Sequence, residues 1–115
     1  MAVSETAMNT EYLVVLCTCP TAGDADAVTT ALLEQRLAAC VNRLTGVRSM
    51  YRWEGRVEYD DEVLLVIKTA ARHFDRLEET ILALHPHDVP EIIGLPIVAG
   101  SRGYLDWIGA SVTDE

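Results

Sequence analysis

The sequence predicts an α+β fold in which two helices cover one face of a four-stranded sheet. Short apolar runs, partly β-branched, predict buried strands, and two longer segments show helical periodicity. The resulting order is strand, helix, strand, strand, helix, strand and a short final helix. This order is typical of the split β-α-β, or ferredoxin-like, arrangement.

The first strand is predicted at residues 12–18, a compact apolar run that ends before a proline. Turn residues follow, and we expect Asp24 to cap the first helix, whose apolar positions recur through about Leu37. Residues 38–44 are strand-like again, and we expect Gly46 to break that strand.

An extended hairpin is predicted next, because side chains alternate along residues 47–53 and a strand-like run resumes at residue 56. Glu54-Gly55 lies between the two runs, and glycine at the second turn position favours a tight hairpin. Residues 62–69 form a further strand rich in valine, leucine and isoleucine.

The second helix is predicted by an apolar stripe at helical spacing, and His85-Pro86 ends it. A short strand follows at residues 92–95, and Ser101 is placed to cap the final short helix. The stripe of the second helix consists of Phe74, Leu77, Ile81 and Leu84.

The second face of the predicted sheet has no helix to cover it. The hairpin also carries Met50, Tyr51, Trp53 and Val57 well away from both helices. Apolar residues on an uncovered face suggest self-association, so we expect a chain that forms oligomers.

Length and composition indicate one globular domain. Of the 115 residues, 50% are hydrophobic, and we assign residues 12–112 to the domain and residues 1–11 to a flexible leader. The formal charge of −9 argues against nucleic acid or an anionic membrane as the partner, since both need a basic surface. No apolar stretch is long enough for a membrane span, and the leader has neither the basic segment nor the apolar run of a signal peptide. We therefore expect a cytoplasmic location, where the three cysteines stay reduced.

Cys17-Thr18-Cys19 is the first candidate for chemistry. Residues two apart on a strand share a face, so two thiolates there can hold a soft or borderline metal such as Cu(I) or Zn. The alternative is a pair of small buried hydrophobes, the more frequent role of free cysteine. Cys40, inside an apolar strand, is interpreted as a core residue.

His85-Pro86-His87 is the second candidate. Neutral imidazole is the commonest metal ligand, and the proline stiffens the loop that carries both rings. The alternative is hydrogen bonding of the histidines to the last carbonyls of the preceding helix.

Aromatic residues offer a third kind of site. Tyr51, Trp53, Tyr104 and Trp107 can line a pocket, although packing is the more frequent use of aromatic rings. Glu62 and Lys68 are candidates to pair with such a pocket, or are solvated strand ends. The phosphate-loop, dinucleotide, zinc-protease and nucleophile-elbow motifs are absent, so we expect no enzyme and no organic cofactor.

Five blocks in order resemble the CutA family, the divalent-cation-tolerance proteins. They are Leu-Ala-Ala-Cys at residues 37–40, Ser-Met-Tyr-Arg-Trp-Glu-Gly at 49–55, Glu62 through Lys68-Thr69, His-Pro-His-Asp-Val-Pro-Glu at 85–91, and Tyr-Leu-Asp-Trp at 104–107. The blocks extend from about residue 13 to residue 108.

The resemblance implies a ferredoxin-like homotrimer that contributes to tolerance of divalent cations, copper above all. Cys17 falls where copper-binding members have a cysteine, and His85 on the His-Pro histidine; a second histidine of some members is Leu84 here. His87 replaces a family tyrosine, so His85 and His87, with Cys17 or Cys19, are expected as a substitute metal site. The resemblance also implies clefts between subunits, lined by Tyr51, Trp53 and Trp107 near Glu62, Lys68 and Glu91.

Two other functions remain open from the sequence. One is a sensor, similar to PII signalling proteins, that binds a small anionic metabolite through Lys68, Arg52 and Arg102 as charge-assisted donors. The other is a structural trimer that presents a surface to a protein partner. The Cys-x-Cys and His-Pro-His pairs favour metal binding over both.

Overall fold

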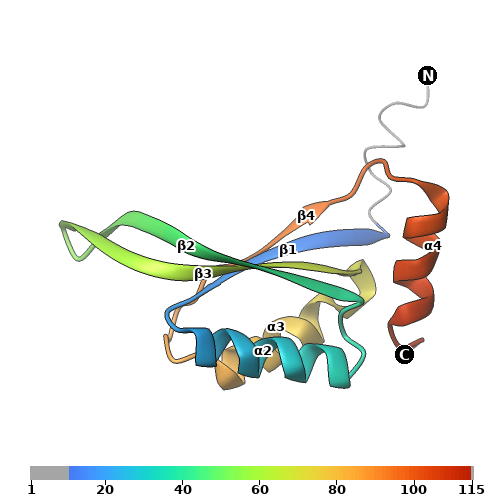
Figure 1. Ribbon diagram of the computed structural model, residues 1–115, viewed down its shortest axis with the longest axis horizontal. Coiled ribbons are helices and arrows are strands. Elements are labelled where there is room, and N and C mark those ends of the chain that lie inside the picture. Colours follow the sequence, from blue (N-terminus) through green and yellow to red (C-terminus); the bar gives the residue numbers. More distant parts are fainter. Residues whose placement is uncertain (1–10, 115) are drawn as a thin grey trace.

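The computed structural model describes residues 11–114 and has the predicted order of elements (Figure 1). Apart from Glu11, the predicted leader lies outside the described residues. The strands are β1 (Tyr12–Cys19), β2 (Cys40–Trp53), β3 (Arg56–Ala70) and β4 (Ile92–Pro96). The helices are α2 (Ala22–Glu34), α3 (Phe74–Leu84) and α4 (Arg102–Ser111), and a 3-10 turn, η1 (Ala71–His73), leads into α3.

The four strands form one antiparallel sheet in the order β2-β3-β1-β4. Helices α2 and α3 lie side by side on one face, and the β2–β3 hairpin projects beyond them (Figure 1). This arrangement confirms the predicted ferredoxin-like α+β fold with an extended hairpin and a short C-terminal helix.

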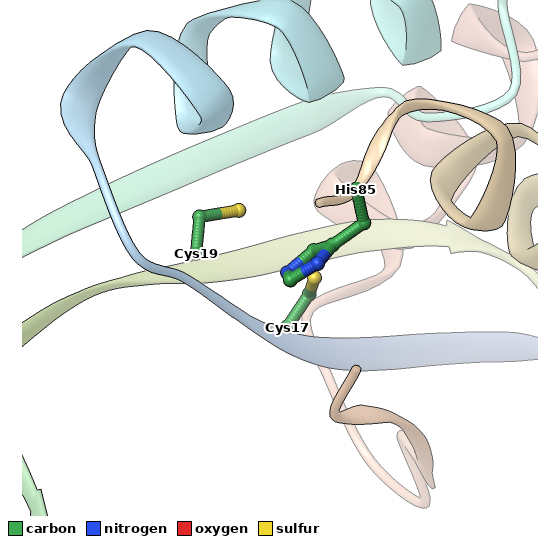
Figure 2. A group of neighbouring side chains, drawn as sticks. All are labelled: Cys17, Cys19 and His85. Carbon is green, nitrogen blue, oxygen red and sulfur yellow. The ribbon is translucent and has the colours of Figure 1, made fainter. Parts of the chain in front are cut away.

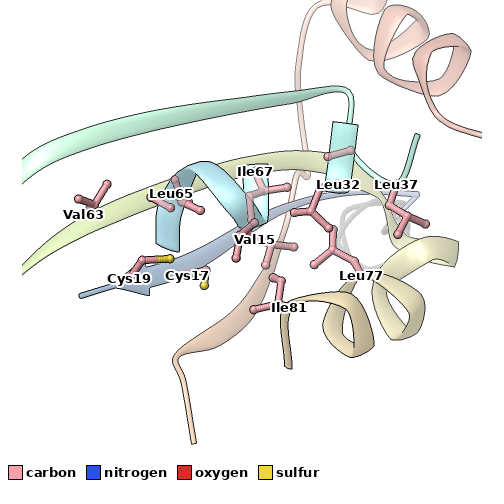
Figure 3. Close-up of a cluster of buried hydrophobic side chains, with 13 residues drawn as sticks. Val15, Cys17, Cys19, Leu32, Leu37, Val63, Leu65, Ile67, Leu77 and Ile81 are labelled. Carbon is pink, nitrogen blue, oxygen red and sulfur yellow. The ribbon is translucent and has the colours of Figure 1, made fainter. Parts of the chain in front are cut away.

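The core lies between the sheet and the two helices. Alternate residues of β1 and β3 point into it, because successive side chains of a strand face opposite sides. Each fully buried leucine or isoleucine contributes about 1.5–3 kcal/mol to stability. Figure 3 shows the central members, Val15, Cys17, Cys19, Leu32, Leu37, Val63, Leu65, Ile67, Leu77 and Ile81.

Two local predictions were wrong. Thr21, not Asp24, caps α2: its hydroxyl accepts a hydrogen bond from the Asp24 N–H at 3.1 Å. Gly46 does not end a strand either, since β2 continues through it to Trp53. The register with β3 shifts between Leu44 and Val47, where Gly46 takes a φ of 77°. Glycine absorbs this bulge because it has no Cβ to clash.

The sheet face opposite α2 and α3 is largely uncovered in the single chain, and we call it the open face. Ile93, Leu95 and Leu44 on it are 48%, 45% and 45% exposed. Helix α4 stands across one end of the sheet (Figure 1). Cys40 pairs with Lys68 and lies on the open face, half-buried, so its assignment to the core was wrong.

Candidate metal centre and neighbouring cleft

Cys17, Cys19 and His85 come together at the end of β1 (Figure 2). One ligand atom from each lies within 4.8 Å of the others, and all three residues are buried. Within residues 11–114 this is the only group of three or more potential His, Cys, Asp or Glu ligands at such spacing. Three of the four predicted metal ligands therefore share one place.

The local structure explains the grouping. The alternation of β1 puts both cysteines on the helix-covered face. His85 is the C-cap of α3 and donates its backbone N–H to the Ile81 carbonyl at 2.8 Å. Its extended backbone, with ψ of 139°, fits a residue that precedes proline. The end of α3 thus directs the imidazole toward β1.

The His85 ring is hydrogen-bonded at both nitrogens. Nε2 lies 2.7 Å from the Thr18 carbonyl oxygen, so Nε2 carries the proton and donates it. Nδ1 accepts the backbone N–H of His87 at 3.1 Å. These contacts define a neutral imidazole, the form that binds metals. For His85 to ligate a metal, one of the two hydrogen bonds must open.

The two thiols form an asymmetric pair. A hydrogen bond with Cys19, together with burial and the charges of Glu91 and Glu62, raises the pKa of Cys17 well above its ordinary value. The same hydrogen bond lowers the pKa of Cys19. Of the two thiols, Cys19 is therefore the one that ionises more easily.

His87 lies outside the three-ligand group. Its ring is tilted by 57° against that of His85 with the centroids 5.1 Å apart, and the residue is exposed. It lines a cleft between the hairpin and the loop that follows α3. The predicted His85–His87 pair is therefore adjacent in space, but the His85 ring lies in the buried cluster with the two cysteines, whereas the His87 ring lines the cleft.

The cleft has a volume of about 890 Å³. Of the predicted cleft residues it contains Tyr51, Trp53, Glu62 and Glu91, whereas Lys68 and Trp107 are not part of its lining. The lining is completed by Thr18, Ser49, Met50, Asp60, Pro86, His87, Asp88, Val89 and Pro90.

Asp60 and Asp88 belong to the cleft and were not singled out in the sequence. Asp60 lies two residues before Glu62 on β3, so strand alternation puts both on one face and offered a signal. Asp60 accepts a hydrogen bond from the Tyr51 hydroxyl, which raises the pKa of Tyr51 to about 12. No comparable pattern marks Asp88, whose position depends on the loop.

Comparison with known proteins identifies the family. The family model described as "CutA1 divalent ion tolerance protein" matches residues 13–111. The chain belongs to the CutA family. A CutA divalent-cation tolerance protein from Thermus thermophilus is 52% identical over 95 residues, covering 83% of this chain and 92% of the relative.

Solved CutA structures share the fold. A Thermus thermophilus CutA1 structure has a TM-score of 0.87 at 48% identity, covering 89% of this chain and 99% of that one. CutA1 from Oryza sativa has a TM-score of 0.88 at 40% identity, covering 92% and 97%. The CutA family is named for tolerance of divalent cations, which suggests a tolerance or binding protein rather than an enzyme. In residues 11–114, no helix has the length and apolar character needed to cross a membrane.

Proposed function

We propose that this CutA protein contributes to cation tolerance by binding copper through Cys17, Cys19 and His85. The observation that supports the proposal is the buried cluster of two sulfurs and one imidazole within 4.8 Å. Soft thiolate ligands select Cu(I), and imidazole suits copper as well. The copper ion is cargo here, and no organic cofactor is part of the proposal.

Charge around the cluster favours a bound cation. Glu62 and Glu91 lie close enough to raise the pKa of Cys17, which means that their carboxylates disfavour an additional negative charge there. A metal ion that replaces the thiol protons removes this conflict. Binding must then release protons, and because the pKa of Cys17 is raised, the affinity increases with rising pH.

We further propose that the chain works as a homotrimer in the cytoplasm. The support for an oligomer is the apolar open face, which the single chain leaves uncovered apart from α4 at one end. The number of subunits is the expectation drawn from the family resemblance. A sensor of anionic metabolites receives no comparable support, because Lys68, Arg52 and Arg102 do not line the cleft.

A copper titration tests the metal site. We expect the reduced protein to bind one Cu(I) per chain in competition with a chromogenic Cu(I) chelator. A Cys17→Ser, His85→Ala double variant is expected to lose this binding. The matched control is Cys40→Ser, which removes the third cysteine on the open face and is expected to bind copper normally.

A second measurement tests the same metal site without the double variant, in case that variant does not fold. Cys17 and Cys19 are buried even without metal, so their alkylation in the unmodified protein is compared with and without Cu(I) in a mildly denaturing buffer and read by peptide mass spectrometry. Bound Cu(I) should slow the alkylation of these two thiols and leave that of Cys40 unchanged. Copper binding that persists in a folded double variant, or protection confined to Cys40, contradicts the proposal.

A further inference from the structure

Cys17 and Cys19 are the one pair of thiols that the fold brings together. A sulfur from each lies, with a ring nitrogen of His85, within 4.8 Å of the others. The third and last cysteine of the chain, Cys40, is on the open face, on the other side of the sheet. Within one chain, each sulfur of the pair therefore has only the other as a partner for a disulfide.

The pair lies away from the surface that the proposed trimer uses. Both cysteines point to the helix-covered side of β1, where the end of α3 brings in His85 (Figure 2). Association of subunits over the open face covers the opposite side of the sheet. The geometry of the single chain therefore also describes the thiol pair in an oligomer.

Burial restricts which oxidant reaches the two sulfurs. Both cysteines are fully buried, and His85 is 8% exposed. A copper ion that enters when one of the His85 hydrogen bonds opens comes into direct contact with both thiols. Cu(II) is thus an oxidant that the proposed function itself delivers to the site.

Two adjacent sulfurs suit the reduction of Cu(II). Soft sulfur ligands favour Cu(I), so a Cu(II) ion held by thiolates is drawn toward the reduced state. Each Cu(II) takes one electron, and a lone thiol that loses one electron becomes a radical. A second sulfur in contact with the first supplies the other electron and closes an S–S bond, which avoids the radical product.

Strand geometry allows a disulfide between Cys17 and Cys19 but strains it. Two residues of extended strand separate their Cα atoms by about 6.6 Å, at the upper end of the range that disulfides bridge. Cys19 is the last residue of β1, so the backbone there can bend toward Cys17. Strained disulfides are the ones that thiols reduce most readily, so we expect the oxidised pair to return to the dithiol.

We propose that the Cys17–Cys19 pair reduces Cu(II) to Cu(I), an activity that rests on the proposed copper site and extends it. Two Cu(II) ions accept one electron each. Both S–H bonds break, one S–S bond forms between the two cysteines, and two protons pass to water. The oxidised pair no longer offers thiolates, so the chain gives up the Cu(I) that it has made. Two low-molecular-weight thiols then reduce the disulfide and become a disulfide themselves.

An anaerobic assay with copper supplied as a Cu(II)–glycine complex measures this activity. The protein carries Cys40→Ser, which leaves Cys17 and Cys19 as its only thiols, and is freed of added reductant. A chromogenic Cu(I) chelator should record two Cu(I) per chain, in step with the loss of both thiols. Residues 1–35 contain no lysine or arginine, so trypsin leaves both cysteines in one peptide, whose mass should fall by two hydrogen atoms.

Single substitutions provide the matched controls. Cys17→Ser and Cys19→Ser, each in the Cys40→Ser protein, keep one thiol of the pair and nearly the same side-chain volume. Both are expected to lose the release of two Cu(I) per chain, because no second sulfur is within reach. Circular dichroism checks that each variant is folded, and the peptide mass from the Cys40→Ser protein tests the disulfide without a change in the cluster.

The outcomes separate this activity from copper binding. A Cys40→Ser protein that binds Cu(I) but leaves Cu(II) unreduced overturns the reduction and keeps the copper site. Reduction at the same rate in the single-thiol variants, or a disulfide that joins two chains instead of closing within one, overturns it as well. Loss of Cu(I) binding and of Cu(II) reduction together overturns both proposals.

Discussion

Arg36 ties the C-terminal helix to the rest of the domain. Its guanidinium donates hydrogen bonds to the carbonyls of Ser111 and Ala110, each at 3.3 Å. Its own carbonyl accepts the backbone N–H of Thr113 at 3.0 Å. The side chain therefore satisfies carbonyls that the end of α4 leaves unpaired and adds a favourable charge there.

We expect Arg36→Ala to lower the free energy of unfolding by about 1–3 kcal/mol, because α4 loses its charged hydrogen bonds. Hydrogen exchange should increase first at the amides of α4. Arg76→Ala on the exposed side of α3 is the control and should change stability by less than about 0.5 kcal/mol. Equal effects of the two variants exclude a special role for Arg36.

Sequence reasoning about the site succeeded where one strand decides the geometry. The shared face of Cys17 and Cys19 follows from the two-residue period alone. The approach of His85 to them depends on how α3 packs on β1, which no local pattern encodes. Lys68 lies on the same face of β3 as Glu62 but six residues away, so it does not line the cleft within one chain, and its place in a cleft between subunits stays a prediction.

Among the elements, the hairpin turn is the most constrained. Glu54 and Gly55 have φ values of 50° and 78°, the signs that a type I′ turn requires at both central positions. Glycine accepts this conformation freely, whereas a glutamate does so at a cost. The sequence predicted the turn from Gly55, but not that the adjoining strand segments at 56–59 and 62–69 form the single strand β3.

Gly55→Ala should destabilise the protein by about 1 kcal/mol through backbone strain, since open space surrounds the position. Glu54→Asn should stabilise it by a few tenths of a kcal/mol, because asparagine tolerates the left-handed region. Thermal unfolding at one protein concentration measures both. Gly23→Ala in helix α2 is the control, because the position has room for a methyl group and the substitution should raise stability. A loss of stability in Gly23→Ala similar to that in Gly55→Ala contradicts the strain argument.

At the scale of the whole molecule, the proposed trimer depends on the apolar open face, which would be buried between subunits. Ile93→Glu with Leu95→Glu places two charges on that face, and we expect light scattering to show monomers in place of trimers. Leu82→Glu alters a residue of α3 that is 46% exposed on the helix side of the sheet and should leave the assembly intact. An unmodified protein that is monomeric at micromolar concentration contradicts the trimer.

The overall fold could be predicted from sequence because each element carries its own local signal and the order of elements selects one known arrangement. Assembly and clefts could not be predicted in the same way. Surfaces such as the one around Asp88 combine a loop with a distant hairpin, and their geometry appears only after the sheet has formed.

The strand order has a consequence for how the chain is made. β1 is synthesised first, yet it pairs only with β3 and β4, which come later in the sequence. At roughly 5–20 residues per second, the ribosome adds β4 roughly 4–15 seconds after β1. Until β3 has been made, both hydrogen-bonding edges of β1 are unpaired on the nascent chain, and the edge that faces β4 stays unpaired until β4 follows. The β2–β3 hairpin, in contrast, can close as soon as β3 is complete. Chaperone capture during translation is therefore expected to target β1 rather than the hairpin.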